Sequence, residues 1–288
     1  MSTADRRRPA DVLEALLREP QRRALWQASA RALMPLHRGP APAELSADLL
    51  VRVLALRRPA EGYDEKLHAR LDVAHLRGHV ARTLGRMGRR AAVAVPVLVE
   101  TLREPLGERC SPMCCSASSV RHEQILARVS VLDALRRLGP QAGRSVPADV
   151  VAELLAPASR RIALSAAELL ARHPESALHH GAALLAALEH PYAPVVEAAA
   201  RGLSRAAPSA AREAVRPLTT LLRHEQGGVR RAAIRALVAM RPGARGSEIA
   251  RAEERFAWLA ERDPDAAVRA VARRALRPSL RARLPLAP

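Results

Sequence analysis

A 34-residue repeat is the feature that most constrains the fold of this 288-residue chain. Short segments such as VVEAAARGL and VRRAAIRAL recur along it, and their final leucines are Leu84, Leu135, Leu169, Leu203, Leu237 and Leu276. Three of the five intervals between these leucines are 34 residues, and Pro140, Pro174, Pro208 and Pro242 repeat the same interval. A period of this length is typical of units that stack on copies of themselves, so we expect a repeat architecture.

Each period contains two helical patterns. In the second helix, apolar residues four apart, such as Val229, Ala233 and Leu237, fall on one face. First helices are expected over 91–102, 146–155, 177–188, 211–222 and 249–259, with Pro96, Pro147 and Pro217 in their first turns, where proline is tolerated. Aromatic residues make up only 2% of the chain, so its core is built from Leu, Val and Ala. The sequence predicts an all-α fold, an α-solenoid of stacked antiparallel helix pairs.

Three segments carry a resemblance to the HEAT-repeat family: AVPVLVETL (94–102), VRRAAIRALVAM (229–240) and DPDAAVRAVARRAL (263–276). They are similar to short bacterial repeats of the phycobilin lyase type. The resemblance implies a superhelix whose second helices line the concave surface. It also implies a ladder in which an Asp ends each first helix and an Arg follows six residues later. The Arg positions are Arg77, Arg128, Arg230 and Arg269, whereas the Asp is kept only at Asp263, the other positions being Leu71, His122, Ala156, His190 and His224.

The domain organisation follows from where the repeat is regular. We expect a HEAT-like array over 67–278, a divergent N-terminal helical cap over 1–66 with a loop at 59–66, and a basic, Pro-rich tail over 279–288. One interval between repeat leucines rises to 51 residues, which predicts a Cys-containing loop insertion near 105–120. Insertions in such arrays map to loops on one face, often the binding face.

Four of the six residues two positions before the repeat leucines are arginines: Arg82, Arg201, Arg235 and Arg274. On stacked helices they would line a positive groove suited to carboxylates or phosphates, with Arg205, Arg230 and Arg269 adding charge nearby. The alternative is a solvated helix face in an Arg-rich chain. The net charge of +18, with Lys66 as the one lysine, fits both codon bias and attraction to an acidic partner.

Two clusters suggest metal chemistry. Cys110, Cys114 and Cys115 with His122 are candidate zinc ligands, but adjacent cysteines in one segment do not match the paired spacing of structural zinc sites. A reactive thiol and a plain loop are the alternatives. The His-Glu pairs of RHEQ at 121–124 and 223–226 resemble iron ligands of deoxyhypusine hydroxylase, yet they are expected at the ends of first helices, where the helix dipole favours histidine. We expect no metal and no cofactor.

The functional expectation is a non-enzymatic, cytoplasmic scaffold that holds an acidic protein partner. The chain has no GxSxG, HExxH or Gly-rich phosphate loop, and no secretory or membrane-spanning segment. Binding of a nucleic-acid backbone through the same arginines is the first alternative. A lyase-like or glycosylase-like HEAT enzyme is the second, although five aromatic residues are few for packing around a base.

Overall fold

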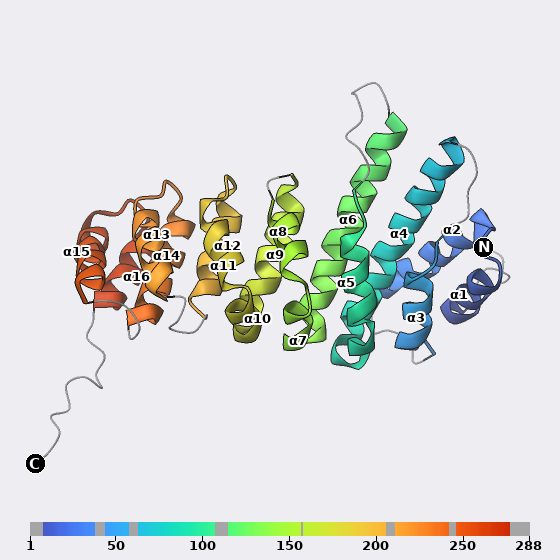
Figure 1. Cartoon of the computed structure of the whole chain (residues 1–288), viewed down its shortest axis with the longest axis horizontal. Coiled ribbons are helices and arrows are strands. Elements are labelled where there is room, and N and C mark those ends of the chain that lie inside the picture. The colour runs from blue at the N-terminus through green and yellow to red at the C-terminus, as the bar shows by residue number, and fades with distance from the viewer. Residues whose placement is uncertain are drawn as a thin grey trace, which may run out of the picture. The chain divides into compact units, whose positions relative to one another are not determined.

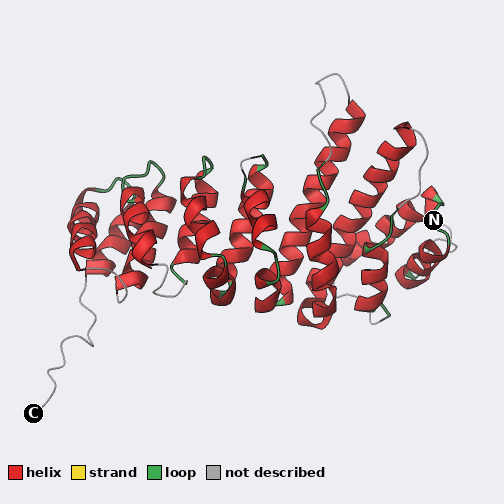
Figure 2. Cartoon of the chain, viewed as in Figure 1, coloured by secondary structure: helices red, strands yellow, loops and turns green. Residues whose placement is uncertain are grey.

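The computed structural model describes residues 8–37, 44–57, 63–106, 115–156, 158–205, 211–241 and 246–276. Within these ranges every regular element is a helix (Figure 2). The chain divides into two compact units, Met1–Leu154 and Leu155–Pro288. Each unit is a stack of antiparallel helix pairs (Figure 1), which confirms the predicted fold class.

The first unit consists of α1 (Pro9–Arg18), α2 (Arg23–Leu33), η2 (Met34–His37), α3 (Ala47–Leu54), α4 (Tyr63–Met87), η3 (Gly88–Ala94), α5 (Val95–Arg103), α6 (Cys115–Leu138), α7 (Pro140–Arg144) and α8 (Ala148–Leu155). Helices α2, α4 and α6 pack in sequence in one layer, and α1, α3 and η3–α5 pack against them. The predicted cap therefore contributes α3 as the antiparallel partner of α4, the first long helix of the array.

Two sequence predictions about this unit are wrong. Residues 63–66, predicted as loop, begin α4, and residues 115–120 of the predicted insertion begin α6. The second helices of these two repeats are thus lengthened at their N-terminal ends, and α4 and α6 pack against each other. For the same reason His122 and Glu123 lie inside α6, not at the end of a first helix.

Small residues let α4 and α6 approach closely. A Cβ atom built on Gly85 would lie 3.0 Å from the Cα atom of Ala134, and one on Gly78 would lie 3.6 Å from that of Ala127. Leu84 and Leu135, next to this contact, are fully buried, as the repeat register predicts. Close backbone approach at 78 and 85 fixes the spacing of the two helices at that level.

The second unit consists of α9 (Arg160–Arg172), α10 (Pro174–His179), α11 (Gly181–Ala186), η4 (Ala187–Glu189), α12 (Ala193–Leu203), α13 (Ala211–Leu221), α14 (Gly227–Met240), α15 (Gly246–Arg262) and α16 (Ala266–Leu276). Helices α9, α12, α14 and α16 pack in sequence as the layer of second helices. Helices α11, α13 and α15 each pack against the second helix that follows them in the chain.

The predicted register holds in the second unit, with two exceptions. Leu203 and Leu237 are fully buried, whereas Leu276 at the end of α16 is 38% exposed because no further described helix follows it. Pro217 lies in the interior of α13, so its predicted place in a first turn is wrong. Val215 and Leu218 beside it are buried, and this packing holds the helix despite the lost backbone hydrogen bond. Pro96 in the first turn of α5 is confirmed.

Candidate functional site

The arginines of the predicted ladder share one local contact. Each donates to a backbone carbonyl just after a first helix: Arg77 to Leu56, Arg128 to Glu104, Arg230 to His224, and Arg269 to Asp263. The last carbonyls of a helix have no intrahelical donor, and a guanidinium satisfies them without being able to lose its charge. Arg230 and Arg269, named above as candidate binding residues, are engaged in these caps.

Arg230 also joins two neighbouring repeats. Its Nη2 and Nε atoms lie 2.7 and 2.8 Å from the two carboxylate oxygens of Asp263, and both side chains are buried. Burial alone would raise the pKa of Asp263. Hydrogen bonds from Arg230 and from the Asp265 N–H, with the charges of Arg230 and Arg269, instead hold that pKa below its usual value. This pair is the ladder contact that the HEAT resemblance implies.

The first unit has a ladder acid that the sequence reading missed. Glu104, in the turn after α5, accepts hydrogen bonds from Arg77 at its carboxylate and from Arg128 at its carbonyl. Placing the ladder position of this repeat at His122 was wrong, because the insertion separates the turn after α5 from the start of α6. The signal that could have found Glu104 is its position directly after the apolar pattern of 94–102.

Histidine replaces the ladder aspartate in two repeats of the second unit. The Nδ1 atoms of His190 and His224 accept the backbone N–H two residues later, at 3.0 Å in each case. Asp263 accepts the N–H of Asp265 in the same way, at 2.8 Å. A neutral imidazole is required as acceptor, and burial lowers the pKa of His190 accordingly. The RHEQ motif at 223–226 is thereby accounted for as a turn cap.

Three of the four arginines that precede the repeat leucines by two positions, a set called the arginine stripe below, lie on helices that pack in sequence. Arg201 on α12, Arg235 on α14 and Arg274 on α16 are exposed, at one register of three successively packed helices. None forms an ion pair with a residue in the described ranges. Helices α14 and α16 contain no acidic residue at all. Since packed helices lie about 8–10 Å apart, the three arginines occupy neighbouring positions along this layer, with Glu197 on α12 as the acidic residue among the three helices.

The other stripe residues have different surroundings. Arg82 lies on α4 in the first unit, where burial lowers its pKa and the charge of Glu123 opposes that change. Ala167, at the same register on α9, is fully buried. Arg205 donates to the carbonyls of Ala171 and Arg172, which end α9. Of the predicted binding residues in the second unit, those without a carbonyl or ion-pair partner in the described ranges are therefore Arg201, Arg235 and Arg274.

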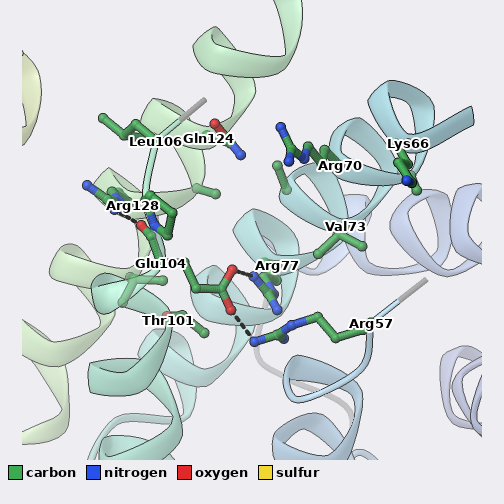
Figure 3. A pocket seen from close by; sticks show the side chains of 15 residues that line it. Arg57, Lys66, Arg70, Val73, Arg77, Thr101, Glu104, Leu106, Gln124 and Arg128 are labelled. Carbon is green, nitrogen blue, oxygen red and sulfur yellow. Dashed lines mark hydrogen bonds and ion pairs between the residues drawn. The ribbon is translucent and has the colours of Figure 1, made fainter. Parts of the chain in front are cut away.

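The first unit contains a cavity of about 260 Å³ between α4 and α6 (Figure 3). Residues at helical spacing line it from both sides: Lys66, Ala69, Arg70, Val73, Ala74 and Arg77 of α4, and Gln124, Ala127, Arg128 and Val131 of α6. Arg57, Thr101, Glu104, Pro105 and Leu106 complete the lining. Its α4 lining, from Lys66 to Arg77, precedes Gly78, where α4 approaches Ala127 of α6 closely.

Five cationic side chains line this cavity against one carboxylate. Glu104 bridges Arg57 and Arg77, and Arg128 lies 3.7 Å from the exposed carboxylate of Glu153. Lys66 and Arg70 form no ion pair with residues that the structure describes. Burial raises the pKa of Glu104, although Arg57 beside it acts in the opposite direction. Of this lining, the sequence reading had singled out only Arg77 and Arg128, as ladder residues.

The metal expectations rest largely on residues that are not described. Cys110 and Cys114 lie outside the described ranges, and Cys115 is placed only as the first residue of α6. His122 is exposed on α6. Over the described part of the chain, no three His, Cys, Asp or Glu side chains gather closely enough to hold a metal ion. No described helix combines the length and apolar character needed to cross a bilayer.

Stacked helix pairs that are joined by buried ladder contacts define a helical-repeat protein. Residues 181–277 match the family model of HEAT repeats. This segment belongs to the HEAT-repeat family, as its sequence pattern predicts. No curated protein sequence matches the chain.

Solved structures share the fold at low sequence identity. An engineered protein is 22% identical, with a TM-score of 0.51, covering 80% of this chain and 94% of its own. UNC-45 from Drosophila melanogaster is 16% identical, with a TM-score of 0.55, covering 88% of this chain. She4p is 12% identical, with a TM-score of 0.53, covering 93% of this chain. The chain spans 33% of the UNC-45 structure and 42% of the She4p structure.

Proposed function

We propose that this protein is a non-enzymatic scaffold that binds an acidic protein segment across α12, α14 and α16. The observation that carries the proposal is that Arg201, Arg235 and Arg274 share one exposed register on packed helices and form no ion pair within the described ranges. An extended acidic chain can place carboxylates against successive helices. Guanidinium–carboxylate contacts are charge-assisted and geometrically selective.

The arginines at 201, 235 and 274 differ from the ladder and cap arginines of the second unit. Arginines at ladder and cap positions of this unit donate hydrogen bonds to backbone carbonyls or to the carboxylate of Asp263. Those at 201, 235 and 274 have neither kind of partner in the described ranges, and no acid on α14 or α16 neutralises them. Like charges aligned on one surface repel each other, and an acidic ligand relieves that repulsion.

Charge reversal of the three arginines should weaken binding of an acidic probe. Each exposed pair contributes only about 0–1 kcal/mol, so a single Arg→Ala change should be nearly silent. The triple variant R201E/R235E/R274E should bind a fluorescent oligoglutamate peptide at least about tenfold more weakly, while its helicity stays unchanged, because all three sites are exposed. Fluorescence anisotropy at low ionic strength measures the affinity.

A matched control variant tests whether the loss of affinity depends on the position of the arginines or only on the net charge. R216E/R251E/R262E reverses three exposed arginines of α13 and α15 in the same unit, so it makes the same change in net charge on the other helix layer. It should retain most of the affinity. Equal losses in the two triple variants would show nonspecific attraction and refute the proposal. Tight, strongly salt-dependent binding of random duplex DNA, with none of oligoglutamate, would replace it by nucleic-acid binding.

A further inference from the structure

We infer that the cavity between α4 and α6 in the first unit is a binding site for a carboxylate carried on a short aliphatic group. This site is separate from the surface of α12, α14 and α16 and does not depend on the function proposed for it. Its chemistry divides into a cationic part and an apolar part, and both parts are needed to specify the ligand.

The cationic part contains groups that can still bind an anion. Arg57 and Arg77 share the carboxylate of Glu104, whereas Lys66 and Arg70, one helical turn apart on α4, form no ion pair with any described residue. The side chain of Arg77 is buried, with an exposed fraction of 8%, and its Nε atom donates to no acceptor among the residues that are described. Leaving a buried donor unsatisfied is costly, which favours an anion that enters the cavity.

The apolar part selects what carries the anion. Val73 and Ala74 of α4, Ala127 and Val131 of α6, and Leu106 after α5 line the space beside the charges (Figure 3). A volume of about 260 Å³ is below the roughly 300–1,000 Å³ of pockets for drug-sized ligands, so the occupant is small. A carboxylate next to a branched aliphatic group fits both parts, whereas a bare phosphate would leave the apolar wall uncovered.

A substitution of Glu104 should strengthen ligand binding, whereas substitutions of the cationic residues should weaken it. The carboxylate of Glu104 occupies Arg57 and Arg77 and repels a second carboxylate in the same cavity. Glu104→Gln keeps the shape of the side chain and removes that charge. The variant should therefore bind the ligand more tightly, whereas K66E/R70E should bind it at least about tenfold more weakly.

Isothermal titration calorimetry on the full chain tests the inference with three probes. A short peptide that ends in a free valine carboxylate should bind, and the same peptide amidated at its C-terminus should bind at least about tenfold more weakly. Titration with isovalerate alone shows whether the carboxylate comes from a free small acid or from the C-terminus of a peptide chain. Affinity equal to that of the peptide assigns the site to a free small acid, and much weaker affinity assigns it to a chain terminus.

Control variants keep the result interpretable. R89E/R90E reverses two exposed arginines of η3 in the same unit and should leave binding unchanged. Circular dichroism must show every variant folded, and K66A/R70A serves if the charge reversal unfolds the unit. Equal binding of acid and amide, absence of binding by both, or competition by inorganic phosphate at lower concentration than the carboxylate would overturn the inference.

Discussion

Replacing Asp263 by asparagine is expected to destabilise the protein by about 3–5 kcal/mol near neutral pH. The change leaves the guanidinium of Arg230, whose side chain is 9% exposed, without its bidentate carboxylate. Removing one member of a buried ion pair costs more than the pair contributes, because the remaining charge stays desolvated. Urea unfolding followed by circular dichroism measures the loss, and Glu261→Gln, an exposed carboxylate on α15, should change stability little.

Lowering the pH should reduce the difference in unfolding free energy between the wild-type protein and the D263N variant. The pKa of Asp263 is depressed in the folded state, so its carboxylate contributes stability that is fully present above the unfolded value of about 3.9. That contribution is lost as the pH falls through the lower folded pKa. The asparagine variant has no such loss. A difference in unfolding free energy that stays constant from neutral pH down to the acid range would show that the pair does not stabilise the fold.

Replacing Leu237 by alanine is expected to cost about 2–5 kcal/mol. Leu237 is fully buried in α14, in the layer between α12 and α16, and truncation leaves a cavity that neighbouring helices fill only in part. Leu276→Ala is the matched control, because Leu276 holds the same register on α16 but is 38% exposed, and it should cost much less. Equal costs at 237 and 276 would contradict the assigned register.

The position of Leu237 also predicts how the protein unfolds. In a repeat array each unit contacts only its neighbours, so a defect in α14 weakens the second unit before the first. Thermal unfolding of Leu237→Ala should therefore broaden or separate into two steps, while wild type unfolds over a narrower range. Native-state hydrogen exchange would show faster exchange in α12–α16 than in α4 and α6.

The repeat register was accessible from the sequence because it depends on local periodicity. Val229, Ala233 and Leu237 share a helix face through their spacing alone, and all three are buried in the structure. Asp263 and Arg230 were assigned to the ladder by their positions in the repeat, and they pair as that assignment implies. Exposure of Arg201, Arg235 and Arg274 followed from the same periodicity, because they lie off the apolar face.

Tertiary structure alone decided where the helices lengthen and what lies between them. The starts of α4 at Tyr63 and α6 at Cys115 have no strong local signal, and packing of α4 against α6 supports helices that propensity alone does not specify. The cavity between these two helices joins Arg57, Glu104 and Arg128 from segments far apart in the chain. Which arginines cap carbonyls and which stay unpaired likewise depends on neighbouring repeats, because a guanidinium reaches beyond its own helix.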